Sequence, residues 1–252
     1  MSPHGKKSAA NIVSFSGIDG AGKSTQIEAL QTYLKDIGFQ VVTIRFWDDV
    51  ARLKSIRESA GHTLFKGDKG VGTPDAPITR KDKNVQSWPM TCIRLVLYFI
   101  DAVSARNAVK NALRSDADFI IFDRYCYDEM ANLNLRNGLL RKYVLLLIAI
   151  VPALGRSYLL DADPAQARER KPEYPLDFVS RNRAAYLDMC NLTGRMTIIS
   201  SMNIDEVRRE ILRYTIADLS TSSHAGGDNG SRNAARRVET KKLDGTHTHP
   251  AS

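Results

Sequence analysis

The stretch NIVSFSGIDGAGKST, from Asn11 to Thr25, decides the fold of this chain of 252 residues. Its apolar run is followed by the pattern GxxxxGKS and then by a helical pattern with Ile27, Leu30 and Leu34 on one face. A strand, a glycine-rich turn and a helix in this order wrap backbone N–H groups around phosphates at the positive end of the helix. The sequence therefore predicts a P-loop that binds a nucleoside triphosphate.

The residues of this turn are expected to divide the work of binding ATP. The Lys23 ammonium reaches the β- and γ-phosphates, and the Ser24 hydroxyl is a ligand for Mg²⁺. ATP is thus the expected co-substrate and Mg²⁺ the expected cofactor. The expected ATP-binding residues are Gly17, Gly20, Ala21, Gly22, Lys23, Ser24 and Thr25.

Short β-rich runs alternate with helical patterns along the body of the chain. The expected strands are 11–15, 40–46, 119–122, 157–161 and 196–200. A long helical pattern covers 91–113, and Asn203 with Glu206 forms a capping box that opens the last helix. Because parallel strands need crossovers, this alternation predicts an α/β P-loop NTPase fold, with about five parallel strands and helices on both faces.

Composition separates one folded body from two polar ends. Residues 1–10 and 219–252 have too few large apolar side chains to offset the entropy of ordering, so both are expected to be disordered. The folded domain is expected to span 11–218. Within it, the polar segment 57–90 is interpreted as a flap, because a loop of that length inside a compact domain usually has a function.

Charge and cysteine content limit the partners and the compartment. The net charge is +8, but the two polar ends hold half of it, which makes nucleic acid an unlikely partner and suits an anionic small molecule. Three cysteines without a CxxC pair, and no apolar core of a signal peptide, predict a cytoplasmic protein. The most apolar stretch, 143–154, is too short to cross a membrane, so no membrane partner is expected.

A second charged group ends the run FIIFDRY, which begins at Phe119. Asp123 and Arg124 are expected at the carboxyl end of a strand, the edge at which open α/β sheets bind ligands. Asp123 is a candidate ligand of hydrated Mg²⁺, and Arg124 a candidate clamp for an acceptor phosphate. An ordinary ion pair at a strand end is the alternative. The chain has no NKxD element, which argues against a GTPase.

The order of these segments resembles the thymidylate kinase family of P-loop nucleoside-monophosphate kinases. The resemblance runs through FSGIDGAGKSTQ, TIRF, IIFDRY and YLLDADP. It implies phosphorylation of thymidine monophosphate (dTMP) to the diphosphate by ATP, and a homodimer formed through a helical face such as 91–113. It also implies that Asp19 organises the acceptor side and that Arg45 binds the acceptor phosphate. Asp123 and Arg124 then correspond to the family's DR pair.

The resemblance also indicates the origin of the catalytic arginine. Family members carry it either in the P-loop or in a lid, and Gly20 stands at the P-loop position in this chain. Segment 163–174 follows the fourth expected strand, where the lid belongs. Its candidate cations are Arg168, Arg170 and Lys171, with a solvated helix face as the alternative for any one of them.

The acceptor side departs from the family pattern in two places. Carboxylates at 48–49 follow the acceptor arginine where proline is usual. The helix with Tyr98, whose ring can stack on thymine, lacks the arginine expected one turn later, where Asp101 or Ala102 lies, depending on the register. Arg94, one turn upstream, is a candidate substitute. The expected acceptor-binding residues are Arg45, Phe46, Arg94, Tyr98, Asp101 and Arg124.

The sequence thus predicts an ATP- and Mg²⁺-dependent phosphotransferase with dTMP as the acceptor. Two alternatives stay open. One is a P-loop kinase of a different small acceptor, such as another nucleotide or a phosphorylated metabolite. The other is a nucleotide-binding regulatory module whose acceptor site has decayed. The presence of Lys23, Ser24, Asp123 and Arg124 favours the enzyme.

Overall fold

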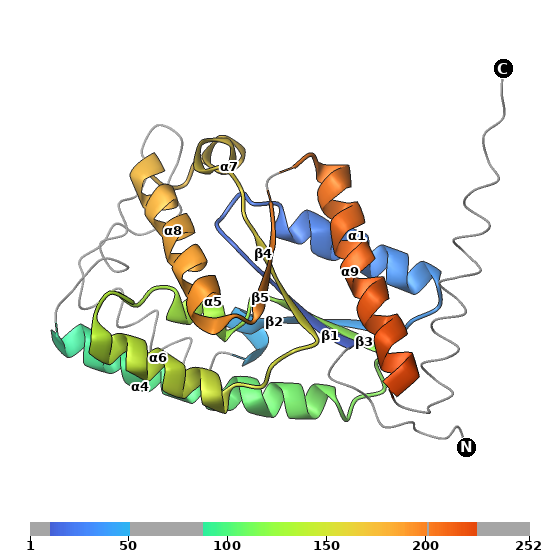
Figure 1. Ribbon diagram of the computed structural model, residues 1–252, viewed down its shortest axis with the longest axis horizontal. Helices are drawn as coiled ribbons and strands as arrows, with labels where there is room; N and C mark the ends of the chain where they lie inside the picture. Colours follow the sequence, from blue (N-terminus) through green and yellow to red (C-terminus); the bar gives the residue numbers. More distant parts are fainter. Residues whose placement is uncertain (1–10, 51–87, 201, 226–252) are drawn as a thin grey trace.

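The computed structural model describes residues 11–50, 88–200 and 202–225 (Figure 1). The expected disordered N-terminus, 1–10, lies outside these residues, as does nearly all of the expected flap. The last three flap positions, 88–90, already belong to a helix. Everything said below about the structure refers to the described residues.

The core of the molecule is one sheet of five parallel strands in the order β2-β3-β1-β4-β5. All five expected strands are present, with bounds shifted by at most a few residues. They are β1 (Ile12–Ser16), β2 (Val41–Arg45), β3 (Phe119–Asp123), β4 (Arg156–Leu160) and β5 (Met196–Ile199). The α/β prediction is confirmed.

Helices cover both faces of this sheet (Figure 1). They are α1 (Lys23–Asp36), a π-helical turn η2 (Phe46–Val50), α4 (Trp88–Ala112), α5 (Cys126–Met130), α6 (Gly138–Ile150), α7 (Pro164–Arg170), α8 (Leu176–Thr193) and α9 (Ile204–Ala225). Side chains alternate across each strand, so Val13 and Phe15 of β1 pack with Ile27 of α1 and Ile211 of α9. Ile12 faces the other way, into the core under α4, α6 and α8.

The position of β1 in the sheet determines where the site lies. β1 is bonded to β3 on one side and to β4 on the other, with Ser14 opposite both Phe122 and Ser157. The turns that follow these three strands therefore meet at one edge. This is the switch point at which doubly wound sheets bind ligands, because the chain leaves it in both directions.

The last helix corrects the expected boundary of the folded body. Asn203 and Glu206 form the predicted capping box, since each backbone N–H donates to the other residue's side chain at 3.3 and 2.9 Å. However, α9 continues to Ala225, and Leu219 is buried in the core at 4% exposure. The folded body therefore does not end at residue 218, because one more apolar side chain reaches the sheet. Residues 226–252 of the expected tail lie outside the description.

The most apolar segment of the sequence coincides with α6. Asn137 caps the N-terminus of this helix, because its side chain accepts hydrogen bonds from the backbone N–H groups of Leu139 and Leu140. Val144, Leu147 and Ile148 then pack into the core. In the described part of the chain, no helix is both long enough and apolar enough to span a membrane.

Candidate active site

The P-loop is the turn between β1 and α1, and its glycines are required by close approach to other backbone. A Cβ atom on Gly20 would lie 2.1 Å from the carbonyl oxygen of Ala167 in α7, and Gly20 has a φ of +82°. A Cβ atom on Gly17 would lie 2.6 Å from the carbonyl oxygen of Leu160 at the end of β4. These contacts leave no room for a side chain at either position, so the loop lies directly against β4 and α7.

Lys23 is the first residue of α1, and its ammonium group folds back onto the loop. Nζ donates to the carbonyl oxygens of Gly17 and Ile18, both at 2.8 Å, and lies 4.0 Å from Oδ1 of Asp19. The residue is only 8% exposed. Burial, assisted by the nearby charge of Arg124, lowers the pKa of Lys23 to about 8. A phosphate group bound here would reverse that effect by favouring the charged ammonium.

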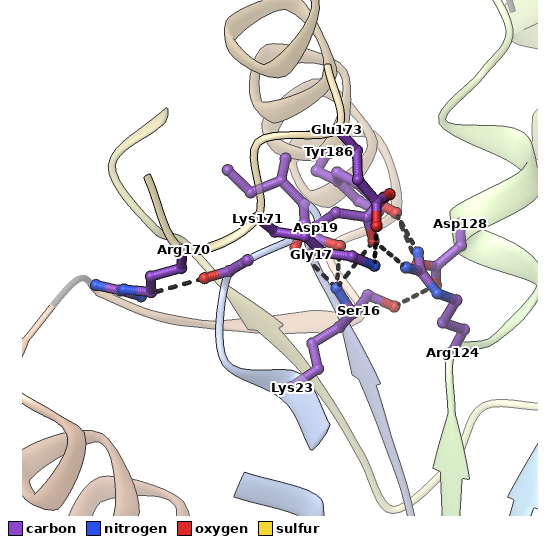
Figure 2. A network of polar contacts seen from close by, with 12 residues as sticks. Ser16, Gly17, Asp19, Lys23, Arg124, Asp128, Arg170, Lys171, Glu173 and Tyr186 are labelled. Atoms are coloured by element: carbon purple, nitrogen blue, oxygen red, sulfur yellow. Dashed lines mark hydrogen bonds and ion pairs between the residues drawn. The ribbon is translucent and has the colours of Figure 1, made fainter. Parts of the chain in front are cut away.

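The two predicted cationic centres share one carboxylate (Figure 2). Asp19 lies between Lys23 and Arg124, and its Oδ1 accepts a hydrogen bond from the Arg124 guanidinium at 2.6 Å. The P-loop and the turn after β3 are thereby joined through a single side chain. The sequence placed these three residues in one site, and the structure brings them together.

Asp128 is a member of this cluster that the sequence analysis missed. It lies in α5, its side chain is 1% exposed, and it accepts hydrogen bonds from Ser16, Tyr186 and Arg124. Its place four residues after Arg124 was the available signal, although α5 begins only at Cys126 and the two residues do not share a helix. Tyr186 carried no comparable signal because it belongs to no motif, and Ser16 lies in the segment FSGIDGAGKSTQ without an assigned role.

Arg124 has an unusual backbone conformation. It is the one described residue other than glycine with a positive φ, +68°. Its backbone N–H donates to the carbonyl oxygen of Phe15 in β1 at 3.0 Å. A left-handed conformation costs about 1 kcal/mol or more for such a residue, and strain of this kind concentrates at functional sites. Burial opposes the guanidinium charge, but Tyr186, Asp128 and Asp19 outweigh it and raise the pKa of Arg124.

The two expected Mg²⁺ ligands fit that ion in chemistry. Ser24 is exposed in the first turn of α1, and Asp123 is half-buried at the end of β3. Both offer hard oxygen atoms, which Mg²⁺ prefers. Among the described residues there is no cluster of three or more side chains that would hold a metal alone. Mg²⁺ commonly keeps several waters and takes further ligands from substrate phosphates, so one or two protein oxygens can hold it.

The end of β2 presents Arg45 next to the DR pair. Arg45 lies opposite Asp123 in the parallel register of β2 and β3, and Arg45 is exposed to solvent. Asp49, whose charge near an acceptor phosphate was unexpected, accepts a hydrogen bond from the backbone N–H of Arg45 at 2.7 Å. Phe46 is fully buried and packs its ring against Trp47 and Tyr125, so it supports the site from within the core.

The expected base-reading residues of α4 do not share one environment. Tyr98 and Asp101 face inward, at 6% and 1% exposure, and Tyr98 belongs to the same core cluster as Phe46. Arg94 is half-buried. Tyr98 and Asp101 thus lie on the core side of α4, and Arg94 lies between the core and solvent.

The lid segment forms α7 and the turn after it. Asp163 is the N-cap of α7, and its side chain accepts hydrogen bonds from the backbone N–H groups of Ala165 and Gln166, both at 3.0 Å. Arg170 reaches the P-loop and donates to the carbonyl oxygen of Gly20 at 3.2 Å (Figure 2). Arg168 instead donates to the carbonyl oxygen of Tyr174 within the lid.

The remaining lid cation, Lys171, forms an ion pair with Glu173 at 3.2 Å. Of the three candidate cations, Arg170 is therefore the one that contacts the P-loop in the described structure. Arg168 and Lys171 are directed at partners in their own segment.

Comparison with known proteins identifies the family. No protein-family model matches the chain. The thymidylate kinase of Bifidobacterium longum strain DJO10A is 30% identical over 191 residues, which cover 71% of this chain and 82% of the relative. A second thymidylate kinase, from Bifidobacterium longum subsp. infantis, is 29% identical over 87% of this chain and 95% of its own length. A probable thymidylate kinase of Methanosphaera stadtmanae is 24% identical over 79% of this chain and 95% of its own length.

These relatives match the chain over most of its length, and the P-loop, the DR pair and the lid helix meet at one edge of the sheet. This chain belongs to the thymidylate kinase family.

Proposed function

We propose that this protein is an ATP-dependent nucleoside-monophosphate kinase that phosphorylates dTMP to the diphosphate. The observation that carries the proposal is the position of Asp19, which lies between the P-loop ammonium and the guanidinium of Arg124. A donor site and an acceptor site that share one carboxylate are close enough for transfer between two bound phosphates. The relatives named thymidylate kinase support the choice of acceptor.

The reaction needs positioning and charge stabilisation. An oxygen of the acceptor phosphate attacks the γ-phosphorus of ATP, and the bond to the oxygen that bridges the β- and γ-phosphorus atoms breaks with its electron pair leaving on ADP. Lys23 exchanges its carbonyl partners for phosphate oxygens, while Arg124 and Arg45 orient the acceptor phosphate. Ser24 and Asp123 are the residues that would hold Mg²⁺, which would supply positive charge to the phosphate oxygens. No covalent intermediate with the protein is needed.

The lid supplies the remaining positive charge in this proposal. Arg170 already contacts the P-loop, whereas Arg168 is bonded within the lid. The carbonyl oxygen of Ala167 fills the space that a side chain at position 20 would need. A P-loop arginine at that position is therefore incompatible with this packing, and Arg170 is assigned as the cation that stabilises the transferring phosphoryl group.

A different acceptor is the second candidate function. The observation that favours it is Asp101, which is 1% exposed at the place where an arginine is expected to read thymine. A buried carboxylate accepts hydrogen bonds where an arginine donates them, so the preferred base would be one that presents donors.

We further propose a homodimer formed by α4 and α6. Large apolar side chains on these contacting helices are left exposed, and an unpartnered apolar surface of this kind is typical of an interface. Those side chains are Ile93, Val96, Phe99, Val103, Leu139, Leu145 and Leu146. On α4 they recur every three to four residues, so they lie on one face of the helix.

The kinase assignment is tested by turnover with ATP and each nucleoside monophosphate. The native protein is expected to phosphorylate dTMP fastest, and Lys23→Ala to lower kcat by at least about a hundredfold, because it removes a charge that stabilises the transition state. The matched control is Lys35→Ala, an exposed lysine in the last turn of the same helix, which should behave as native. Near-native turnover of Lys23→Ala, or no transfer to any monophosphate by the native protein, contradicts the proposal.

The lowered pKa of Lys23 predicts proton uptake on nucleotide binding. At pH 8.5 a pKa of about 8 leaves much of the free protein neutral at this position, and bound phosphates restore the charged form. Calorimetric titrations with ATP in buffers of different ionisation enthalpy should therefore show uptake of a fraction of a proton at pH 8.5. Lys23→Arg, which stays charged at this pH, should show none. Equal heats in all buffers for the native protein would exclude this role of Lys23.

The two lid arginines are distinguished by paired substitutions. Arg170→Ala is expected to lower kcat by about a thousandfold, as loss of a phosphate-stabilising arginine does in related chemistry. Arg168→Ala should lower kcat far less, because the Arg168 guanidinium is bonded to the carbonyl oxygen of Tyr174 within the lid. The kcat values of both variants and of the native protein are compared at saturating ATP and dTMP. A larger loss for Arg168→Ala would reverse the assignment.

Sedimentation velocity tests the dimer. The native protein should sediment at twice the chain mass of 28.1 kDa, and Val96→Asp at the chain mass, because a charge in an apolar interface is costly. Ile204→Asp is the control, since Ile204 is an exposed apolar residue at the start of α9, a helix that packs on the opposite face of the sheet from α4 and α6. A native protein that sediments as a monomer at micromolar concentration, or a Val96→Asp variant that remains dimeric, rejects this surface.

A further inference from the structure

We propose that Asp128 is a positioning residue that anchors one side of the Arg124 guanidinium, so that the other side is released from Asp19 to the acceptor phosphate. This inference rests on the proposed kinase function and deepens it, because it assigns different tasks to the two carboxylates around Arg124. Neither the sequence motifs nor the names of the relatives assign a role to Asp128.

The first step of the argument is the hydrogen bonding of the Asp128 carboxylate. Oδ2 accepts from Ser16 Oγ at 2.6 Å and from the backbone N–H of Tyr125 at 3.1 Å. Oδ1 accepts from the Tyr186 hydroxyl at 2.7 Å and from the Arg124 guanidinium at 3.3 Å. Four donors from β1, the β3–α5 turn and α8 therefore fix both oxygens (Figure 2). A carboxylate held in this way has no freedom to follow a moving guanidinium.

The second step is the unequal exposure of the two carboxylates. The side chain of Asp128 is 1% exposed, whereas that of Asp19 is 27% exposed. Arg124 directs NH1 toward Asp128 and Tyr186, and NH2 toward Asp19. An incoming phosphate can compete for NH2 because water already reaches the Asp19 side. It cannot compete for NH1, because displacing a buried carboxylate would leave that charge unpaired.

The third step concerns the backbone of the same turn. Arg124 has a φ of +68°, and the next residue, Tyr125, gives its backbone N–H to Asp128. Asp128 thus holds the strained turn and the side chain that extends from it. An arginine positioned at both ends loses less freedom when phosphate binds, which is the physical basis of a preorganised site.

The experiment is a steady-state comparison with dTMP and ATP varied separately. Asp128→Asn keeps the shape of the side chain but removes its charge, and we expect the KM for dTMP to rise about ten- to a hundredfold, the usual effect of losing a hydrogen bond to a charged group. The KM for ATP should change less than about twofold, because the hydrogen bonds described for Asp128 come from Ser16 at the end of β1, from the β3–α5 turn and from α8, and not from residues 17–22 or Lys23. Tyr186→Phe removes the hydroxyl that donates to Asp128 and accepts from Arg124, but it leaves the Asp128 carboxylate in place, so it should shift the KM for dTMP in the same direction by less.

Two further variants separate positioning from general support of the fold. Asp218→Asn is the matched control, because Asp218 forms a two-point ion pair with Arg156 at 2.6 Å at the opposite end of β4. It should leave both KM values unchanged. In an Arg124→Ala background, Asp128→Asn should raise the KM for dTMP no further, since Asp128 is proposed to act only through Arg124.

The outcomes are distinct. A selective rise in the KM for dTMP that disappears in the Arg124→Ala background supports the proposal. Unchanged constants in Asp128→Asn or Tyr186→Phe, equal shifts for both substrates, or additive effects with Arg124→Ala overturn it while the kinase assignment stands. If Asp128→Asn does not fold, Tyr186→Phe and its combination with Arg124→Ala decide by the same criteria. Absence of transfer by the native protein overturns the proposed function, and this inference with it.

Discussion

The site depends on one guanidinium that is shared by two carboxylates. Arg124 and Lys23 are both largely withdrawn from water, and burial, assisted by the nearby charge of Arg124, lowers the pKa of Lys23. Two such cations remain in place because oxygen atoms of the protein surround them: the carboxylates of Asp19 and Asp128 for Arg124, and the loop carbonyls for Lys23. Phosphate oxygens can replace the exposed members of this set without any large movement of the chain.

The sheet order makes that arrangement possible. Because β1 lies between β3 and β4, the P-loop, the turn with Arg124 and the lid segment begin at neighbouring strand ends. Side chains from these segments are therefore close enough to bond directly. Asp19 of the P-loop accepts a hydrogen bond from Arg124 in the turn after β3, and Arg170 of α7 donates to the carbonyl oxygen of Gly20. Burial of β1 on both faces fixes these strand ends rigidly, since its five residues are all in the core. The positions of the site residues are thus fixed by the most buried strand of the sheet.

The sequence revealed the donor side of the site better than the acceptor side, for a physical reason. Phosphate binding by Lys23 and its glycines depends on local spacing, so strand, turn and helix could be predicted from one contiguous segment, as could the five strands. The cluster around Asp128 depends on α8, a helix that carries no motif and was not predicted. The sequence therefore offered no basis for placing Tyr186 in the site. The end of α9 was misplaced because a single buried residue, Leu219, extends the helix past a polar region that resembles a tail. Acceptor binding by Phe46 stays a prediction, and the ring is buried in the core, packed against Trp47 and Tyr125.

Contact between the P-loop and α7 links the two sides of the proposed reaction. Gly20 has no side chain, and the space where one would begin is taken by the backbone of Ala167. Any movement of α7 away from the loop would therefore also withdraw Arg170 from its hydrogen bond to Gly20. In the proposed mechanism, a lid that carries the catalytic cation and also packs on the phosphate-binding backbone would supply its charge only when α7 lies against the loop. Water would then be excluded in the same step that brings the last positive charge to the site, which would favour transfer to a bound acceptor over hydrolysis.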